Sequence, residues 1–120
     1  MAKSVHRGPR ELWHALIWSL QGLRAAWQTE SAFRLEVVLL VIFVPLGLWL
    51  GVGGSEKALL VGVLLPIPAG EMFNSAVEAL ADKLWPEQNP VAGRIKDLAA
   101  AAVFVLIVNA LVVWTLVWAL

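Results

Sequence analysis

The chain has 120 residues, of which 60% are hydrophobic and 15% are charged, and its nine basic and nine acidic side chains give a net charge of zero. A soluble domain carries about 25% charged residues, so this composition indicates an integral membrane protein and gives no sign of a nucleic-acid partner. Cysteine is absent, which excludes disulfides and thiol chemistry. We therefore expect residues 1–120 to form one all-α membrane domain.

The first predicted element is an amphipathic helix over residues 9–28. Pro9 can begin a helix, because its missing N–H would be unpaired there in any case. Apolar residues follow at helical spacing, and polar ones occupy much of the other side. Indoles and arginines on such a helix are typical of a membrane interface, with a helix of a soluble bundle as the alternative.

Three apolar runs then predict membrane helices at about residues 32–52, 56–82 and 97–120. Ser55 is expected to cap the second of these helices. Pro66 and Pro68 predict a kink or a short unwound turn before Glu71, because each removes a backbone hydrogen bond. Residues 83–97 are rich in turn formers and predict a polar loop, and Asn109 is expected to bond between helices.

The basic residues predict how the chain crosses the membrane. Five of the nine Lys and Arg residues lie in residues 1–34 and three in residues 83–97. The positive-inside rule places the N-terminus and the 83–97 loop in the cytoplasm. Three spans then place the C-terminus outside.

A polar stripe marks the second predicted span. At 100° per residue, its members fall within about a quarter of the helix circumference: Glu71, Asn74, Ser75, Glu78 and Asp82. Ionisable groups near lipid are costly, so aligned ones usually face a protein interior or a water-filled site. We expect this stripe to be the working face of the protein.

These carboxylates lie at two depths, which suits two tasks. Glu30 and Glu78, near water, fit a hard cation such as Mg²⁺. Glu71, deeper in the span, fits a general base. Lys96 offers positive charge for phosphate, and Asp97 can accept hydrogen bonds from a ribose or a base. The combination fits phosphoryl transfer from a water-soluble nucleotide to a hydroxyl at the membrane surface.

The residues alone leave other functions open. Paired carboxylates on one membrane helix also occur in proton-coupled transporters and ion channels, and a structural subunit is a third possibility. The sequence contains neither a P-loop nor a protein-kinase signature.

Four segments resemble the bacterial integral-membrane diacylglycerol kinase family, and the resemblance covers the chain from about residue 10 to its end. They are GLRAAW (22–27), ESAFR (30–34), EMFNSAVEALAD (71–82) and GRIKD (93–97). The N-terminal half is similar to the diacylglycerol kinases of Gram-negative bacteria. Glu71-Met72 and residues 96–100 are more similar to undecaprenol kinases of Gram-positive bacteria. The chain departs from the family pattern at Glu11 and Leu35, and at Pro66, Pro68 and Gly70.

The resemblance implies a homotrimer in the bacterial inner membrane, with one surface helix and three membrane helices per chain. It implies transfer of phosphate from ATP, with Mg²⁺, to a lipid alcohol at sites shared between protomers. Glu71 and Asn74 match catalytic positions, and Glu30 and Glu78 match the metal ligands. The positions matched to ATP contacts are Arg10, Trp18, Glu30, Glu78, Glu87, Gln88, Asn89, Lys96 and Asp97. Those matched to lipid contacts are Ala15, Ser19, Arg24, Trp27, Ala32, Arg34, Glu36, Glu71 and Ala100.

Overall fold

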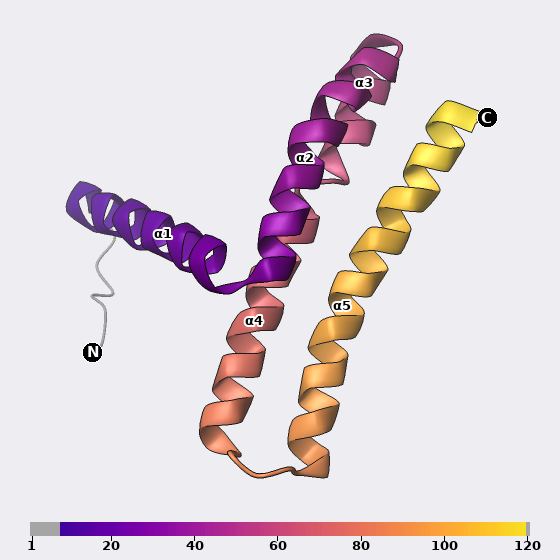
Figure 1. The fold of residues 1–120 in the computed structure, drawn as a ribbon. Helices are drawn as coiled ribbons and strands as arrows, with labels where there is room; N and C mark the ends of the chain where they lie inside the picture. Colours follow the sequence, from indigo (N-terminus) through magenta and orange to yellow (C-terminus); the bar gives the residue numbers. More distant parts are fainter. Residues whose placement is uncertain (1–7, 120) are drawn as a thin grey trace.

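The computed structural model describes residues 8–119, and this part of the chain is helical, with short connections and no strand (Figure 1). Its elements are α1 (Pro9–Thr29), α2 (Ser31–Leu50), α3 (Gly53–Gly62), α4 (Pro66–Leu84), α5 (Pro90–Trp114) and the short π-helical turn η1 (Thr115–Ala119). Helix α2, the α3–α4 pair and α5 run alongside one another, and α1 projects to one side. The predicted position of the N-terminus concerns residues 1–7, outside the described residues.

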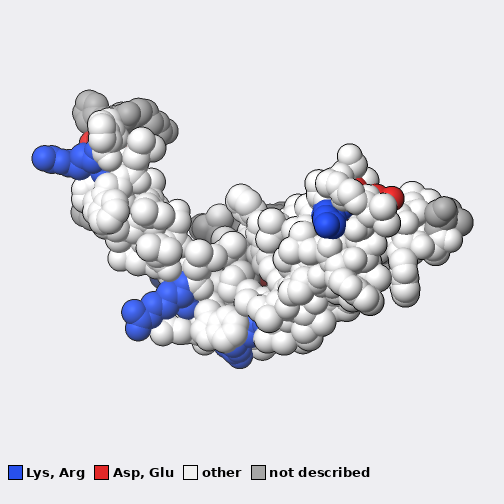
Figure 2. All heavy atoms as spheres, turned by 90° about the horizontal axis from the view of Figure 1, so that it is seen from above, with Lys and Arg blue, Asp and Glu red and all other residues white. Residues whose placement is uncertain are grey.

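Three segments are long and apolar enough to cross a membrane: Ser31–Leu50, Gly53–Leu84 and Pro90–Ala119. This confirms the prediction of three helices that are apolar enough to span a membrane. Much of their apolar surface is exposed in the single chain, with Trp49 79% and Phe73 76% exposed. From the end that carries α3 and η1, the surface is largely uncharged, with charged residues in small separate patches (Figure 2). Such a surface suits contact with lipid or with other protein chains.

Helices α1 and α2 meet at a single non-helical residue, Glu30. Its N–H bonds the carbonyl oxygen of Ala26 at 2.9 Å, and its carbonyl oxygen accepts the N–H of Arg34 at 3.2 Å. The Arg34 guanidinium also donates to the carbonyl oxygens of Trp27, at 2.7 Å, and Gln28, at 3.4 Å. These bonds satisfy carbonyl groups that the end of α1 leaves free.

The second span is interrupted at residues 63–65, between α3 and α4. Pro66 and Pro68 have no N–H, so the regular ladder of hydrogen bonds cannot continue through them. The N–H of Leu64 turns to the carbonyl oxygen of Val61, at 3.0 Å. The carbonyl oxygen of Leu60, left without its usual donor, accepts the indole N–H of Trp114 on α5 at 2.9 Å. The predicted unwound turn is confirmed, and it lies just before Pro66.

Two predicted boundaries are wrong. Helix α3 begins at Gly53, where φ is +77°, so Ser55 lies inside the helix and does not cap it. Its first turn is closed by the Glu56 carboxylate, which accepts the N–H of Val52 at 3.0 Å. Helix α5 begins at Pro90 rather than 97, and the predicted 83–97 loop is correspondingly short. The Asn89 side chain accepts the N–H groups of Val91 and Ala92, at 2.8 and 3.4 Å, and so starts the helix early.

Candidate active site

The polar stripe of α4 forms a connected cluster of side chains. Within residues 8–119, Glu71 and Asn74 are the buried polar side chains, 8% and 9% exposed. The Asn74 amide Nδ2 donates to Glu71 Oε2 at 3.4 Å and to Glu78 Oε1 at 3.1 Å. Positions three and four apart lie on one helix face, which lets one amide join both carboxylates. The prediction that Glu71, Asn74 and Glu78 share a face is confirmed.

Glu30 reaches the same cluster from the joint between α1 and α2. Its Oε1 accepts the hydroxyl hydrogen of Ser75 at 2.8 Å, and its Oε2 accepts that of Thr29 at 3.4 Å. Ser75 bonds Glu30, and its neighbour Asn74 bonds Glu78. The two predicted metal ligands therefore approach one region, Glu30 from the joint between α1 and α2 and Glu78 from α4.

Glu36 brings a further carboxyl group from α2. It lies in contact with the carboxyl group of Glu71. Glu36 Oε1 and Asn74 Oδ1 are buried oxygens that accept no hydrogen bond from the described residues. An acceptor left unpaired in this way costs about 1–3 kcal/mol. The cluster is thus suited to a ligand that brings a hydroxyl group, a water molecule or a cation.

The oxygen atoms of this cluster fit magnesium chemically. Mg²⁺ is usually bound by one or two carboxylates together with water and substrate phosphates. Glu30 and Glu78 supply two carboxylates, and Asn74 Oδ1 is a further hard oxygen. In the described part of the chain, no group of three or more His, Cys, Asp or Glu side chains has the arrangement of a metal site. Two carboxylates and one amide oxygen fill only part of the octahedral shell of Mg²⁺, whose other positions are usually taken by water and substrate phosphates.

Apart from this cluster, a cleft of about 580 Å³ lies where α4 is connected to α5. It is lined by Asp82, Trp85, Pro86, Glu87, Gln88, Asn89, Pro90, Ala92, Gly93 and Lys96. Four of the predicted nucleotide contacts therefore come together here, whereas Asp97 is not among the lining residues. The ammonium group of Lys96 forms an ion pair with the Asp82 carboxylate. Both side chains are well exposed to water, so a phosphate group can replace Asp82 at little cost.

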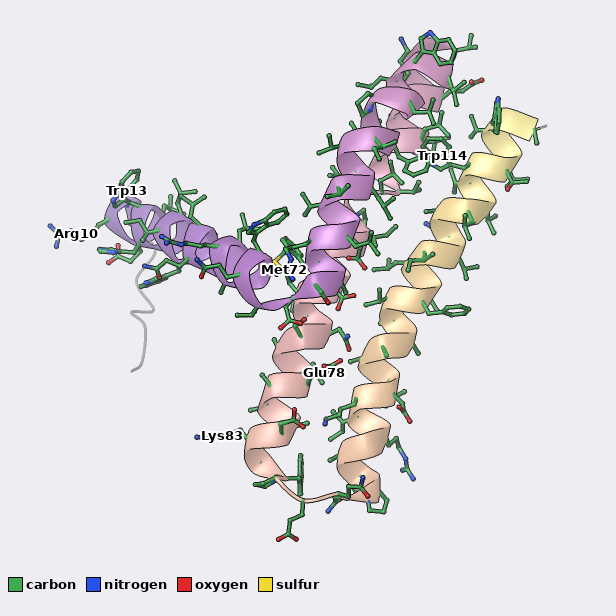
Figure 3. All side chains as sticks on the ribbon, viewed as in Figure 1. Arg10, Trp13, Met72, Glu78, Lys83 and Trp114 are labelled. Atoms are coloured by element: carbon green, nitrogen blue, oxygen red, sulfur yellow. The ribbon has the colours of Figure 1, made fainter. Side chains whose placement is uncertain are left out.

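The residues of α1 that were predicted as ligand contacts are not among those that form the α4 cluster or line the cleft. Figure 3 shows Arg10 at the outer end of α1, far from Glu78 on α4. Trp18 stacks on His14 with ring centroids 5.8 Å apart, and the Ser19 hydroxyl donates to the carbonyl oxygen of Ala15 at 2.8 Å. Arg24 also lies on α1, where its side chain is exposed.

The remaining predicted lipid contacts are spread over three helices. Trp27, Ala32 and Arg34 flank the joint at Glu30, and Ala100 lies on α5. Arg34 is bonded to the last turn of α1, so it has a structural task in addition to any contact with lipid.

Three residues have site contacts that the sequence did not assign. Ser75 and Asp82 belong to the polar stripe, but their partners, Glu30 and Lys96, come from distant parts of the chain. Trp85 is a half-buried indole in the cleft at the α4–α5 connection. In the sequence, the one feature that could have indicated this role is that Trp85 lies in a polar segment rather than in an apolar run.

Comparisons with known proteins agree on one family. Residues 17–118 match the sequence model described as prokaryotic diacylglycerol kinase. The chain is 38% identical to the diacylglycerol kinase of Escherichia coli K12 over 102 residues, which is 84% of each protein. It is 39% identical to that of Haemophilus influenzae over 97 residues, 81% of this chain and 82% of the relative. It is 38% identical to that of Pseudomonas aeruginosa over 112 residues, 93% of this chain and 88% of the relative.

Proposed function

The chain belongs to the prokaryotic diacylglycerol kinase family, and we propose that it transfers the γ-phosphoryl group of ATP to the free hydroxyl group of diacylglycerol, forming phosphatidic acid. This membership makes the chain a lipid kinase rather than the transporter that the carboxylates alone also allowed. The relatives compared above are all named diacylglycerol kinase, which supports diacylglycerol over undecaprenol as the acceptor.

The observation that carries the proposal is the buried carboxylate of Glu71, held by the amide of Asn74. In the proposed reaction, the oxygen of the lipid hydroxyl bonds to the γ-phosphorus while Glu71 accepts the proton of that hydroxyl. The bond from that phosphorus to the bridging oxygen breaks, and ADP leaves. Asn74 orients Glu71, and its free Oδ1 is available to a donor on a substrate.

The nucleotide is proposed to lie between the α4 cluster and the cleft at the α4–α5 connection. Glu30 and Glu78 would hold Mg²⁺, which when bound neutralises negative charge on the phosphates. Lys96 would exchange its ion pair with Asp82 for a phosphate contact. Glu87, Gln88, Asn89 and Asp97 are the proposed contacts to the rest of the nucleotide. Because Arg10 lies at the outer end of α1 and Trp18 midway along it, we assign their proposed nucleotide contacts to a site shared with a neighbouring protomer.

We further propose a homotrimer in the bacterial inner membrane, with α1 on the cytoplasmic surface. The exposed amide of Asn109 supports assembly, because a polar side chain within an apolar span is costly when it faces lipid. Its prediction as a bond between helices then applies to the contact between chains. On this arrangement, Ala15, Ser19, Arg24, Trp27, Ala32, Arg34 and Ala100 line the approach of the lipid.

Phosphate transfer in mixed micelles tests the proposal. Purified protein receives labelled ATP and Mg²⁺, with diacylglycerol and undecaprenol offered in parallel. Labelled phosphatidic acid is the expected product, and Glu71→Gln is expected to lower kcat by about 10²–10⁴-fold, the range for loss of a general base. Glu11→Gln, which removes a carboxylate outside the cluster, serves as the control.

Each other outcome has a defined meaning. Label in undecaprenol alone would change the acceptor and keep the family and the site. Full activity of Glu71→Gln would remove Glu71 as the base. No labelled lipid from a folded, assembled protein would refute the proposed reaction.

A further inference from the structure

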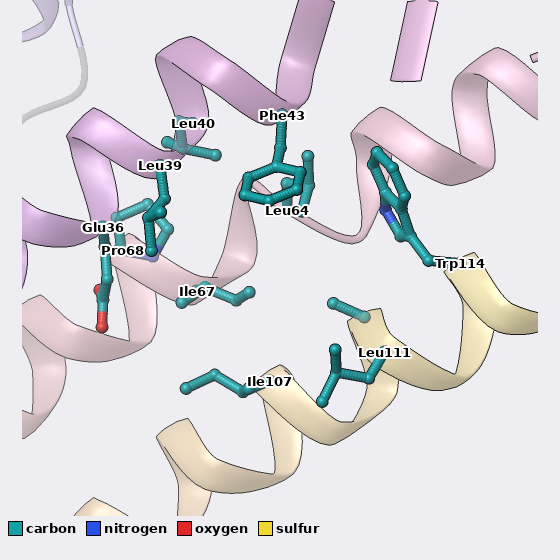
Figure 4. A pocket seen from close by; sticks show the side chains of 11 residues that line it. Glu36, Leu39, Leu40, Phe43, Leu64, Ile67, Pro68, Ile107, Leu111 and Trp114 are labelled. Atoms are coloured by element: carbon teal, nitrogen blue, oxygen red, sulfur yellow. The ribbon is translucent and has the colours of Figure 1, made fainter. Parts of the chain in front are cut away.

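The cleft at the α4–α5 connection differs in character from the hollow inside the spans. That hollow, of about 280 Å³, lies between α2, the start of α4 and α5, and it presents apolar surface alone (Figure 4). The cleft has charged and amide side chains in its lining, and one aromatic ring, that of Trp85. Its volume of about 580 Å³ is within the range of roughly 300–1,000 Å³ that is usual for small-molecule sites. A single indole in a polar cleft suits a ligand that has both a flat face and polar groups.

The end of α4 directs the side chain of Trp85 to this cleft. Pro86 disfavours a helical conformation for the residue before it. Trp85 accordingly has φ −130° and ψ 78°, and α4 ends at Leu84, although the N–H of Trp85 still bonds the carbonyl oxygen of Ala81 at 2.8 Å. Leu84 is 60% exposed and does not line the cleft, whereas Trp85 is half-buried and does. Of these two neighbours, Leu84 therefore faces the surroundings and Trp85 faces the cleft.

The ring of Trp85 is free to contact a ligand. In the described part of the chain its indole has no hydrogen bond and no ring contact, whereas the indole of Trp114 bonds Leu60. Pro86 and Pro90 lie in the segment that follows Trp85, and each fixes its own φ, so this segment has few conformations open to it. A ring held in place in this way loses little freedom when a flat group packs against it.

The order of residues along α4 matches the order of groups in a nucleoside triphosphate. Asp82 lies three positions before Trp85, roughly 5 Å along the helix axis, and its carboxylate pairs with Lys96 of α5, a proposed phosphate contact. Glu78, a proposed ligand of Mg²⁺, lies seven positions before Trp85, roughly 10 Å along the axis. A base at Trp85 would thus direct the phosphates toward Lys96 and the metal, and the γ-phosphoryl group toward Glu71.

We propose that Trp85 stacks on the base of the nucleotide and gives this chain a preference for purine over pyrimidine triphosphates. The inference rests on the proposed function, because that function supplies the nucleotide. Every base has a π-face, and removing an aromatic side chain on which a base stacks weakens binding by about tenfold. A purine has two fused rings and covers more of an indole than the single ring of a pyrimidine does.

Contact with the membrane is the alternative for an indole at the end of a span, since tryptophan is common at membrane interfaces. The position of Trp85 favours the nucleotide. Its neighbours in the cleft include Glu87, Gln88 and Lys96, which are groups for a polar ligand rather than for lipid chains.

The experiment measures phosphate transfer to diacylglycerol from ATP and from CTP in three variants. Trp85→Leu removes the ring and keeps apolar bulk, and Trp85→Phe keeps an aromatic face. Trp118→Leu makes the first exchange at a 69% exposed position outside the cleft. We expect Trp85→Leu to raise KM for ATP by about tenfold and bring it close to KM for CTP, with kcat and KM for diacylglycerol unchanged. Trp85→Phe should keep most of the preference for ATP, and Trp118→Leu all of it.

An inhibitor without a base separates stacking from the phosphate contacts. Magnesium tripolyphosphate should inhibit wild type and Trp85→Leu equally, because it carries no base. Inhibition by ADP should weaken by about tenfold in Trp85→Leu. Equal weakening of both inhibitors would show that Trp85 shapes the whole cleft, and it would overturn the inference. An unchanged KM for ATP in Trp85→Leu would overturn it too, and both results leave the kinase reaction intact.

A binding measurement keeps the inference separate from the proposed function. Absence of lipid phosphorylation would count against the function, whereas MgADP can still be titrated into the full-length protein in detergent. We expect MgADP to change the tryptophan emission of wild type and to change that of Trp85→Phe less. Equal changes in the two proteins would refute stacking at Trp85, even if Trp85→Leu fails to fold. Emission from Trp85 that brominated phosphatidylcholine quenches and MgADP leaves unchanged would identify a membrane contact instead.

Discussion

The hydroxyl group of Ser75 on α4 donates a hydrogen bond of 2.8 Å to the carboxylate of Glu30, at the joint between α1 and α2. The two residues are 45 positions apart in the sequence. The bond fixes a carboxylate from the joint beside the buried pair Glu71 and Asn74. It thereby holds two helices in the relation that the proposed magnesium site needs.

Removing this hydroxyl is expected to weaken the metal site. A hydrogen bond to a charged group is worth about 1.5–3 kcal/mol, so Ser75→Ala should raise the Mg²⁺ concentration for half-maximal turnover by roughly tenfold. Ser75→Thr keeps the hydroxyl and should remain close to wild type. A Mg²⁺ titration of phosphate transfer at saturating ATP measures the change. Equal behaviour of the two variants would show that the hydroxyl does not orient Glu30.

Lys96 is expected to serve the nucleotide rather than stability. Its exposed ion pair with Asp82 should contribute less than about 1 kcal/mol to stability. Lys96→Met should raise KM for ATP by about tenfold, since a charge-assisted bond to phosphate is lost. Lys83→Met is the matched control, because Lys83 points away from α5 (Figure 3). The same KM in both variants would place the phosphate elsewhere.

Asn89 allows a structural role to be separated from a nucleotide contact. Its side chain caps α5, and Asn89→Ala should lower stability by about 1 kcal/mol, the usual cost of a lost cap. Asn89→Asp preserves the cap and should restore stability. Thermal unfolding in detergent measures the first role, and KM for ATP measures the second. Raised KM in the stable Asp variant would support a direct nucleotide contact, and an unchanged KM would leave capping as its task.

The indole of Trp114 is expected to stabilise the break between α3 and α4. Trp114→Phe leaves the carbonyl oxygen of Leu60 without its donor, which should cost about 1–3 kcal/mol. Trp118→Phe, at a 69% exposed position, should change stability by no more than about 0.5 kcal/mol. Thermal unfolding of the two variants in the same detergent gives the comparison. Equal midpoints would show that the break needs no donor from α5.

Local sequence signals predicted the spans well and helix ends less well. Long uncharged runs located the three spans, and Pro66 and Pro68 located the break in the second. The start of α5 was missed because turn formers filled residues 83–97, and the capping geometry of Asn89 outweighed them. Ser55 was misplaced because the helix already begins at Gly53, where the Glu56 carboxylate accepts the N–H of Val52.

The candidate site was predictable where its geometry follows from one helix. Glu71, Asn74 and Glu78 share a face because their spacing fits 3.6 residues per turn, and their bonds follow from that. The bond of Ser75 to Glu30, the contact of Glu36 with Glu71 and the pairing of Lys96 with Asp82 depend on how helices pack. The pattern of a single segment cannot predict contacts between helices. The resemblance to a family indicated the roles of these residues but not their contacts.

The joint between α1 and α2 has a mechanical consequence. Glu30, the single residue between α1 and α2, has φ −115° and ψ 105° and also carries a carboxylate of the cluster. The residue that joins α1 to α2 is therefore also the proposed metal ligand. If α1 lies on the membrane surface as proposed, a tilt of α1 would reorient the Glu30 carboxylate, because no other residue separates the two helices. Lateral pressure or curvature in the bilayer would then act on the proposed metal site through this single residue.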